Sequence, residues 1–104
     1  MDGVFKALAD PNRRKMLDLV RDHPGINVNA LTEHFKFSRY ATMKHLRILA
    51  EAKLILAKKE WKEKRLYLNA VPIQQIYDRW ISNYAGKWAS SLTNLKDNIE
   101  RKKP

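Results

Sequence analysis

The segment from Ser38 to Glu51, SRYATMKHLRILAE, constrains the fold of this chain more than any other stretch. Serine is favoured at a helix N-cap because its hydroxyl accepts a hydrogen bond from an otherwise unpaired backbone N–H, and apolar residues then recur at helical spacing. On a helical wheel, one face carries Thr42, Leu46 and Leu49. A second face carries Arg39, Tyr40, Met43, Lys44 and Arg47. The pattern predicts a helix that buries one face in a core and offers the other to a polyanion.

The positive charge of the chain is concentrated around this helix. Among 104 residues there are 21 Lys and Arg against 11 Asp and Glu, for a net charge of +10. Such an excess is typical of proteins that bind nucleic acid or an anionic membrane. Residues 36–65 hold ten of the basic residues and three of the acidic ones, which is seven of the ten net charges. Because these charges coincide with patterned elements, we favour nucleic acid over a merely solvated surface.

Length and composition predict one domain over residues 1–104 with a modest core, since a monomer of this size buries roughly 65% of its unfolded surface. The absence of cysteine excludes disulfides, thiolate metal sites and cysteine nucleophiles. No apolar run approaches the roughly 20 residues that span a bilayer, and the N-terminal residues do not resemble a signal peptide. We therefore expect a cytoplasmic protein with no membrane partner.

Two helices are predicted before the helix-turn-helix. A short first helix is expected to carry the apolar residues Val4, Phe5 and Leu8. It ends before Pro11, because a residue that precedes proline is disfavoured in the α region. Asp10 then caps a second helix with Pro11 in its first turn, and the apolar stripe of this helix holds Met16, Leu17 and Val20.

A helix-turn-helix is predicted at about residues 29–53. After an extended run at residues 26–28, Asn29 is the expected N-cap of a brief helix that carries Leu31 and Phe35. A turn at residues 36–37 leads into Ser38 and the basic helix. Two helices joined by a short turn form the helix-turn-helix motif, in which the second helix reads DNA.

From Leu54 the apolar period changes towards two, and this change predicts a wing at about residues 54–70. The β-prone runs are LILAKKEW and RLYLN, separated by a charged turn of Lys62, Glu63 and Lys64. We expect a hairpin. The sequence names no partner for Trp61 beside the turn, and packing of the hairpin onto the body of the domain is one role open to it. The predicted fold class is therefore mainly α with a small antiparallel β wing, a winged helix-turn-helix.

The last predicted helix, at about residues 73–102, has more apolar surface than one small domain can cover. Its large apolar residues recur every three or four positions, over about 45 Å at about 1.5 Å per residue. They are Ile73, Ile76, Tyr77, Trp80, Ile81, Tyr84, Trp88, Leu92, Leu95 and Ile99. A second copy is expected to bury the remainder in a dimer interface. The aromatic residues of this stripe could instead line a small-molecule pocket at the dimer seam.

Three stretches of the chain carry a family resemblance. The first is ALADPNRRKMLDLV, residues 7–20, which is similar to the sequence ALADPTRRRIL. The second is LTEHFKFSRYATMKHLRILAEAKLI, residues 31–55, which is similar to LAEALGLSQPAVSKHLRVLREAGLV. The third is RLYLN followed by an aromatic-rich last helix. Together they resemble the ArsR/SmtB family of winged-helix repressors over nearly the whole length.

The resemblance implies a homodimeric, sequence-specific repressor whose partner is double-stranded DNA, with an effector that the sequence does not name and no cofactor. The positions that match the family's DNA-facing residues on the reading helix are Ser38, Arg39, Tyr40, Met43, Lys44 and Arg47. The matching wing residues are Lys62, Lys64 and Arg65. The expected dimerisation residues are Val4, Phe5, Leu8, Trp80, Tyr84, Trp88, Leu92 and Leu95.

Physical chemistry suggests a role for each group of DNA-facing residues. Arg39, near the helix start, could pair bidentately with guanine O6 and N7, a contact worth about 1–3 kcal/mol of discrimination. Lys44 and Arg47 are expected to meet phosphates. The wing cations are expected to hold the neighbouring backbone or the minor groove, which adds salt dependence but little sequence information. Tyr40 and Met43 are expected in the groove, where Met43 could touch a thymine methyl, although both could instead be buried.

The chain also departs from the family pattern. Arg39, Tyr40 and Met43 replace the usual Gln, Pro and Ser, so an operator cannot be inferred from relatives. Lysine stands at three turns where glycine is common, at positions 36, 53 and 62–64, and a non-glycine residue in the left-handed conformation costs roughly 1 kcal/mol or more. These lysines are a candidate extension of the phosphate-binding surface.

A metal site is not expected. The family's paired cysteines before the reading helix correspond to Asn27 and Asn29 here, and the last helix has no histidine for the family's other site. The chain's three histidines are His23, His34 and His45, and their spacing does not place them on one helix face. A packing role for His45 is expected.

Other functions remain open from sequence alone. An enzyme finds little support, because there is no glycine-rich phosphate loop and no convincing catalytic spacing. A winged helix that binds RNA or ribosomes would use the same charge to recognise an A-form helix by shape and 2′-hydroxyls. A protein-interaction module whose last helix docks a different partner is the third interpretation. Relative affinity for RNA tests the second interpretation, and a monomeric mass supports the third.

Overall fold

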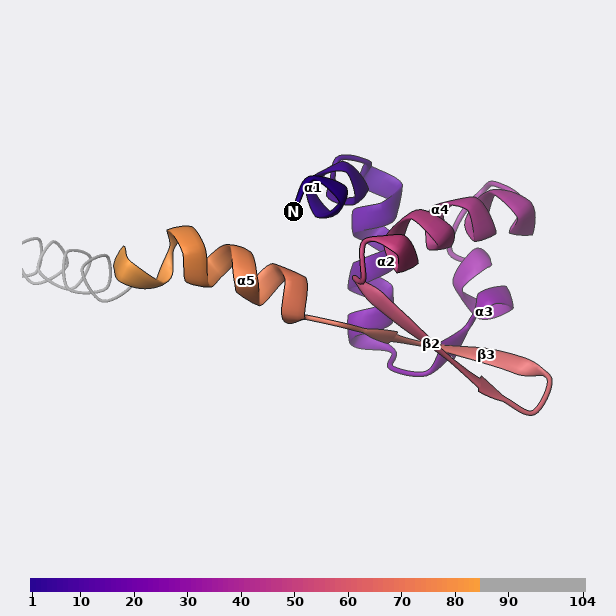
Figure 1. Cartoon of the computed structure of the whole chain (residues 1–104). Helices are drawn as coiled ribbons and strands as arrows, with labels where there is room; N and C mark the ends of the chain where they lie inside the picture. Colours follow the sequence, from indigo (N-terminus) through magenta and orange to yellow (C-terminus); the bar gives the residue numbers. More distant parts are fainter. Residues whose placement is uncertain (85–104) are drawn as a thin grey trace, which may run out of the picture. The chain divides into compact units, whose positions relative to one another are not determined.

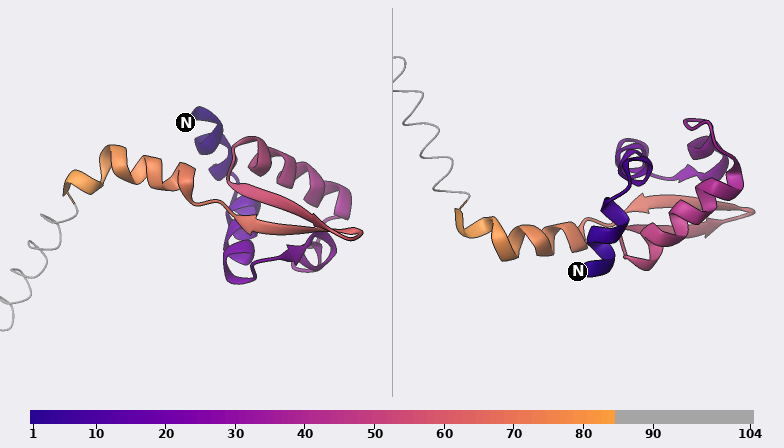
Figure 2. Two further views of the ribbon diagram at one scale, coloured as in Figure 1. Left: turned by 60° about the horizontal axis from the view of Figure 1, so that its bottom comes forward. Right: turned by 90° about the horizontal axis from the view of Figure 1, so that it is seen from above.

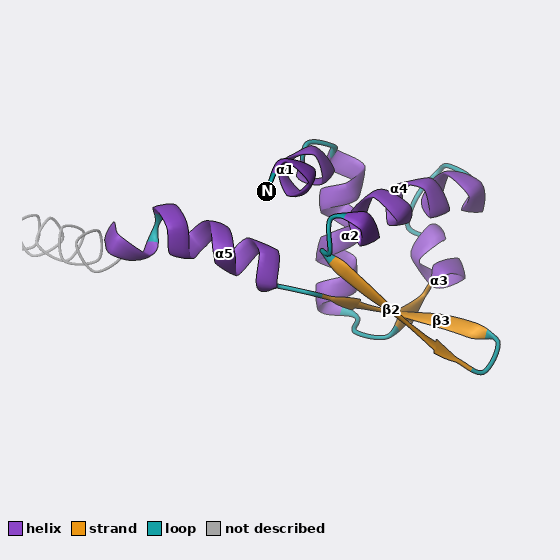
Figure 3. Ribbon diagram, viewed as in Figure 1, coloured by secondary structure: helices purple, strands orange, loops and turns teal. Residues whose placement is uncertain are grey.

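The computed structural model describes residues 1–84 of the chain, which divides into two units, Met1–Pro72 and Ile73–Pro104. The elements of the first unit are four helices and three strands, and α5 begins at its end (Figure 1; Figure 3). In order they are α1 (Asp2–Leu8), α2 (Pro11–Asp22), β1 (Ile26–Asn27), α3 (Val28–Thr32), α4 (Arg39–Glu51), β2 (Ile55–Glu60), β3 (Glu63–Leu68) and α5 (Val71–Trp80). The mainly α, winged helix-turn-helix prediction is confirmed, whereas a single domain over the whole chain stays a prediction.

Local chemistry explains where the first two helices begin and end. The Asp10 side chain accepts hydrogen bonds from the backbone N–H of Asn12 and of Arg13, at 2.8 and 3.2 Å, so it caps α2 as predicted. Pro11 occupies the first turn, where its missing N–H is no loss. The chain then leaves α2 through Gly25, whose φ of +87° is readily adopted by glycine.

The core of the first unit lies where α2, α3, α4 and the sheet meet. Its largest fully buried side chains are Met16, Val20, Leu31, Thr42, Leu49, Leu54 and Leu66. Burying each large apolar side chain contributes about 1.5–3 kcal/mol, so the packing of these residues, and not helix propensity, holds α4 in place. The buried face predicted for α4 is confirmed at all three of its positions.

The helix-turn-helix begins two residues earlier than its asparagine pattern predicts. Asn27, and not Asn29, is the N-cap of α3, and its side chain accepts a hydrogen bond from the N–H of Ala30 at 2.8 Å. The helix ends at Thr32, so Phe35 lies in the turn beyond it. Both asparagines can cap a helix, and the pairing of β1 with β3 extends the backbone up to Asn27. The choice between them is therefore made by a long-range contact.

A polar contact beside the core also links α3 and α4. The hydroxyls of Thr32 and Thr42 are hydrogen-bonded at 3.0 Å, and Thr42 is fully buried. The Ser38 hydroxyl accepts a hydrogen bond from the N–H of Ala41 at 3.2 Å, which confirms the predicted cap of α4. After α4, Lys53 has a φ of +63°, so the left-handed residue expected at this turn is present although it is not glycine.

The wing is part of a three-stranded antiparallel sheet in the order β1-β3-β2. β2 and β3 pair from Ile55↔Leu68 to Glu60↔Glu63, so the turn consists of Trp61 and Lys62. The predicted turn at Lys62–Lys64 is therefore wrong, because Glu63 and Lys64 already belong to β3. Both views in Figure 2 show the hairpin tip projecting from the helices of the first unit.

The second unit is described here only by α5 and the few residues that follow it. Only the N-terminal part of the predicted helix over residues 73–102 falls within the described residues, with Val71–Trp80 as the observed helix. Among residues 73–84, five large apolar side chains are 37–55% exposed: Ile73, Tyr77, Trp80, Ile81 and Tyr84. This face of the chain therefore has a strongly apolar surface.

Candidate nucleic-acid interface

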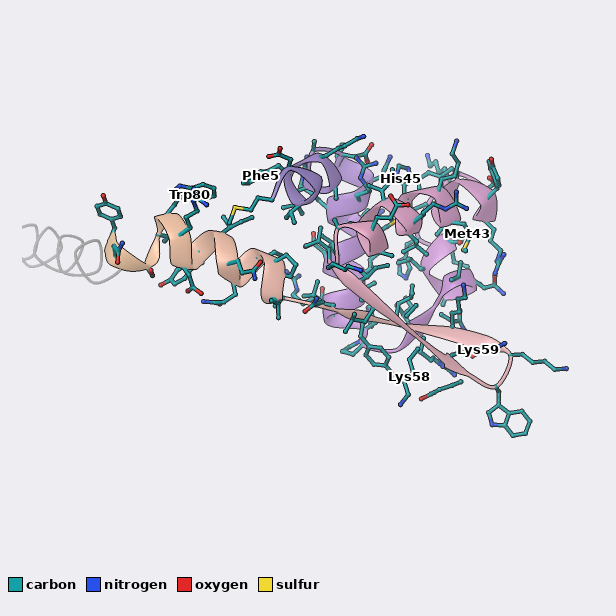
Figure 4. All side chains as sticks on the ribbon, viewed as in Figure 1. Phe5, Met43, His45, Lys58, Lys59 and Trp80 are labelled. Atoms are coloured by element: carbon teal, nitrogen blue, oxygen red, sulfur yellow. The ribbon has the colours of Figure 1, made fainter. Side chains whose placement is uncertain are left out.

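The fold sorts the side chains of α4 by how far they project. Four side chains of α4 are exposed to solvent: Arg39, Tyr40, Lys44 and Arg47. Tyr40 is the only aromatic residue among them, and its relative exposure is 73%. Met43 is half-buried on the side of α4 that faces α3 (Figure 4). Because the opposite face is locked in the core, these side chains project from a helix with little freedom to rotate.

Arg39 is held at the start of α4 by a neutral partner. Its Nε donates a hydrogen bond to Oδ1 of Asn29 at 2.9 Å, across the helix-turn-helix. The two terminal nitrogens of Arg39 have no hydrogen-bond or ion-pair partner among residues 1–84. A guanidinium held through Nε keeps its terminal edge available for two parallel hydrogen bonds to an acceptor pair such as guanine O6 and N7.

Tyr40 and Lys44 form a second exposed pair one turn apart. The Lys44 ammonium lies 5.6 Å from the centre of the Tyr40 ring, within the range of a cation–π contact. This contact limits the positions open to a long lysine side chain. It places a positive charge and a flat aromatic surface together on the exposed face of α4.

A groove separates the start of α4 from the wing. Both parts of the candidate interface line this groove. α4 contributes Arg39 and Met43, and the wing contributes Lys62 and Lys64. Asn27, Val28, Asn29 and Glu63 complete the lining. The structure therefore brings the predicted reading helix and the predicted wing cations to one concave surface, which sequence spacing alone does not reveal.

The cations of the wing fall into two kinds. Arg65 lies 2.9 Å from Glu63 and 3.8 Å from Glu60, and it donates a hydrogen bond to the carbonyl of Gly25 at 3.2 Å. Lys59, Lys62 and Lys64 have no ion pair within the described part of the chain. Arg65 is thus engaged with the wing's own acids, and this neutralisation leaves the three lysines as the wing's available positive charges.

Arg13, which no sequence pattern singled out, contacts α1 and α4 from its place on α2 and so connects three helices behind the reading face. Its guanidinium donates to the carbonyls of Ala7 and Lys6, at 2.8 and 3.0 Å, and lies 3.3 Å from Nδ1 of His45. His45 also packs its ring 5.4 Å from that of Phe37, centre to centre, so the packing role expected for His45 is confirmed. The available signal was the RR pair after ADPN, within the stretch similar to the family.

The charge of Asp10 is stabilised at the same junction. Partial burial disfavours the carboxylate, but hydrogen bonds from the N–H of Arg13 and of Asn12, together with the Arg13 charge, outweigh burial and lower the pKa of Asp10 below its ordinary value. The N-cap of α2 is therefore a carboxylate at neutral pH.

The side chains that could bear on metal binding either make structural hydrogen bonds or lie apart from one another. Asn27 caps α3 and Asn29 holds Arg39, so both positions that match the family's cysteines have structural contacts. The rings of His23 and His34 stack 6.4 Å apart, which their spacing did not predict. Within residues 1–84, no three His, Asp or Glu side chains gather in a metal-binding arrangement. None of the helices within that range is long and apolar enough to cross a membrane.

The predicted dimerisation residues occupy different environments. Val4 is buried, at 8% exposure, whereas Phe5 is half-exposed and Leu8 half-buried. On and after α5, Trp80 and Tyr84 have large exposed surfaces. The remaining three, Trp88, Leu92 and Leu95, lie outside the described residues.

Comparison with known proteins gives consistent relatives in sequence. No family model matches the chain. It is 33% identical over 92 residues to the transcriptional repressor SdpR of Bacillus subtilis (strain 168). The matched region is 88% of this chain and 100% of SdpR. It is 31% identical over 86 residues to the uncharacterized HTH-type transcriptional regulator YuzN of the same organism, with 77% of this chain and 94% of YuzN covered.

Solved structures give the same picture. The crystal structure of an ArsR family transcriptional regulator matches with a TM-score of 0.70 and 27% identity, over 86% of this chain and 90% of that one. The solution structure of a homodimeric winged helix-turn-helix DNA-binding domain from Mycobacterium bovis matches with a TM-score of 0.63 and 20% identity, over 79% and 82%. SdpR, YuzN and the ArsR family protein are all named as transcription regulators.

Proposed function

The chain belongs to the ArsR family of winged-helix transcriptional regulators, and we propose that it is a homodimeric repressor of an inverted-repeat site in duplex DNA. The observation that carries this proposal is the division of α4 into a core face and an exposed basic face. Thr42, Leu46 and Leu49 fix the helix, while the side chains of Arg39, Lys44 and Arg47 project from it. A helix of this kind is suited to the major groove, which is wide enough to admit it.

Within the groove, the side chains of α4 have separate tasks. The N-terminal residues of a recognition helix approach the base edges, and Arg39 stands first in α4 with its terminal nitrogens available. Arg39 is therefore assigned to a guanine, with Asn29 as its positioning residue. Lys44 and Arg47, further along the helix, are assigned to phosphates, which set the register without reading sequence. Met43, which lines the protein groove between α4 and the wing, is assigned to contact a thymine methyl in the DNA major groove.

The wing is assigned to the flanking DNA backbone. Lys62 and Lys64 line the groove shared with Arg39, so DNA seated on α4 comes within reach of their side chains. Each phosphate that they neutralise releases counterions and adds to the salt dependence of binding. Arg65, engaged with Glu60 and Glu63, braces the hairpin in this proposal and contributes less directly to DNA binding.

A second copy of the chain is assigned to the apolar surface of residues 73–84. Ile73, Tyr77, Ile81 and Tyr84 recur at helical spacing and are 37–55% exposed, and a second copy of the chain would remove this apolar surface from water. The similar Mycobacterium bovis domain is described as homodimeric. Two-fold symmetry then predicts half-site centres about one helical turn, roughly 34 Å, apart.

Repression is the regulatory direction that the relatives favour. The similar protein SdpR is named a transcriptional repressor, and a dimer seated on a promoter excludes polymerase from the same DNA. Such a protein would act in the cytoplasm, without a membrane partner, a cofactor or catalysis.

Selection from a random duplex library at about 150 mM salt, together with the mass in solution, tests the proposed function. Screening at this ionic strength weakens non-specific attraction. The proposal predicts an enriched inverted repeat bound by a dimer. A monomeric mass, or binding without enrichment that vanishes as salt rises, would contradict it. Tighter binding to structured RNA than to the best duplex would favour the RNA-binding function instead.

A further inference from the structure

Trp61 is the least expected residue of the wing. Packing onto the body of the domain, the role left open for Trp61 by the sequence, is not observed, because its side chain is 95% exposed at the tip of the hairpin. Its φ of +57° lies in the left-handed region, which glycine adopts readily because it has no Cβ and which tryptophan adopts only at a cost in energy. The hairpin thus presents the largest apolar side chain in the genetic code to solvent, at a turn position that glycine would occupy more easily.

The backbone fixes where the indole stands. Six residue pairs join β2 and β3, and the last of them, Glu60↔Glu63, closes directly against the turn. The turn itself has only two residues, Trp61 and Lys62. A loop this short leaves the base of the Trp61 side chain little freedom, so less conformational entropy is lost when the ring is bound.

The charge around Trp61 indicates the chemistry of its partner. Lys59, Lys62 and Lys64 all lie within three residues of Trp61 along the hairpin, and Figure 4 shows Lys59 on the hairpin. The acids Glu60 and Glu63, which would repel an anionic partner, are both engaged by Arg65, at 3.8 and 2.9 Å. A flat apolar ring among cations suits a partner that combines phosphates with stacked rings, which is a nucleic acid.

We propose that Trp61 is a wedge that enters the minor groove of duplex DNA and inserts its indole between two base pairs beside the half-site read by α4. The inference rests on the proposed function, because DNA on α4 is what brings the wing tip to a groove. Lys62 and Lys64 hold the phosphates on either side, while the indole replaces part of the stacking that it disrupts. Apolar wedges of this kind kink the duplex by about 20–90°.

The wedge has a consequence for sequence preference. Pyrimidine–purine steps, TA and CA/TG, unstack more easily than other steps. A dimer with two wedges is therefore expected to favour such a step at one fixed position in each flank of the inverted repeat, outside the bases that Arg39 reads. This preference arises from deformability, with no hydrogen bond to the base edges.

The experiment uses the full-length protein and the duplex obtained by selection, with 2-aminopurine placed in turn at each flanking step. Unstacking raises the fluorescence of this base analogue, so the wild-type protein is expected to raise it at one step per flank. Trp61→Ala is expected to abolish the rise and to weaken binding about tenfold, within the range of base–aromatic stacking. Trp61→Phe, which keeps an aromatic ring, is expected to retain most of both effects.

Lys62→Ala is the matched control at the same turn. It is expected to lower the salt dependence of binding while the 2-aminopurine signal persists, whereas Trp61→Ala leaves the salt dependence unchanged. If Trp61→Ala binds within twofold of the wild type and the fluorescence never rises at any step, the wedge is wrong although the dimer still selects its repeat. If the wild-type protein selects no duplex, the proposed function and the wedge fall together.

Discussion

The reading helix and the exposed part of the wing hairpin are both basic, but they are held in place differently. α4 buries Thr42, Leu46 and Leu49, and Arg13 anchors it from behind through His45. In β2, by contrast, Ile55 is buried and the five residues that follow are exposed, so the hairpin keeps its shape mainly through backbone pairing with β3. A core fixes the direction of the α4 surface, which base recognition requires, whereas the phosphate contacts of the wing lysines need only charge and reach.

The two regions also treat their arginines differently. Arg39 on α4 is positioned by a neutral amide, so its full charge and its terminal nitrogens remain available. Arg65 in the wing is positioned by two carboxylates and a carbonyl oxygen, which consume much of its hydrogen-bonding capacity. Two basic residues predicted from the same charge pattern therefore receive different functions, and the identity of the positioning partner decides which.

The largest expected difference between the regions is in stability. Leu49→Ala removes a fully buried side chain of α4 and is expected to lower the free energy of unfolding by about 2–5 kcal/mol. Leu56→Ala, at a wing position that is 54% exposed, is expected to change it by no more than about 0.5 kcal/mol. Denaturant unfolding followed by circular dichroism at one protein concentration measures both, and equal losses would remove the contrast.

Specificity is the next largest difference. Arg39→Ala is expected to relax preference at one base pair per half-site by about 1–3 kcal/mol, because alanine cannot form the bidentate hydrogen bonds to guanine. Asn29→Ala keeps the guanidinium but frees it, so a smaller relaxation at the same base pair is expected. Competition binding with every substitution in the half-site provides the measurement. A uniform loss across all sites would show that Arg39 is a phosphate contact.

The N-cap of α2 supports the reading helix through Arg13, and its contribution depends on pH. Asp10→Ala is expected to cost about 1 kcal/mol of stability at pH 7. Since the pKa of Asp10 is lowered by folding from 3.8, the stabilisation is complete above that value and is lost as pH falls through the lower, folded-state pKa. Asp10→Asn keeps a capping oxygen without the charge, so its stability curve should lack this acid-dependent component. A gap between wild type and Asp10→Asn that stays constant as the pH falls below 3.8 would contradict this assignment.

The smallest expected effect is in the wing. Lys64→Ala is expected to weaken every duplex alike and to lower the salt slope by about 1 for each phosphate that the protein no longer neutralises. Lys58→Ala is the control, because its ammonium already lies 4.0 Å from Glu60 and it is expected to change the slope less. DNA-binding titrations at several salt concentrations measure both slopes. A change in base preference with Lys64→Ala would contradict the assignment of base recognition to α4 and of phosphate binding to the wing.

Local chemistry made much of the first unit predictable from sequence. The caps at Asp10 and Ser38 and the core face of α4 follow from residue type and helical spacing, and these predictions are confirmed. The exposed positions of Arg39, Lys44 and Arg47 follow from the same wheel. Their contact with DNA stays a prediction.

What the sequence could not supply depends on contacts between distant segments. Asn27 rather than Asn29 is the N-cap of α3 because β1 pairs with β3. Met43 is half-buried at the groove between α4 and the wing, and helical spacing alone does not reveal that groove. The hairpin turn shifts to Trp61 because register, and not the β propensity of tryptophan, sets the last pair at Glu60 and Glu63. The Arg13 junction joins α1, α2 and α4, and no local pattern encodes it.

The most direct test of the account compares the affinity for the selected inverted repeat with that for a shuffled duplex over a series of salt concentrations. If α4 reads bases and the wing binds backbone, both affinities fall as salt rises, while their ratio persists at about a thousandfold or more. A ratio that collapses towards one at about 150 mM salt would mean that the basic surface attracts DNA without reading it.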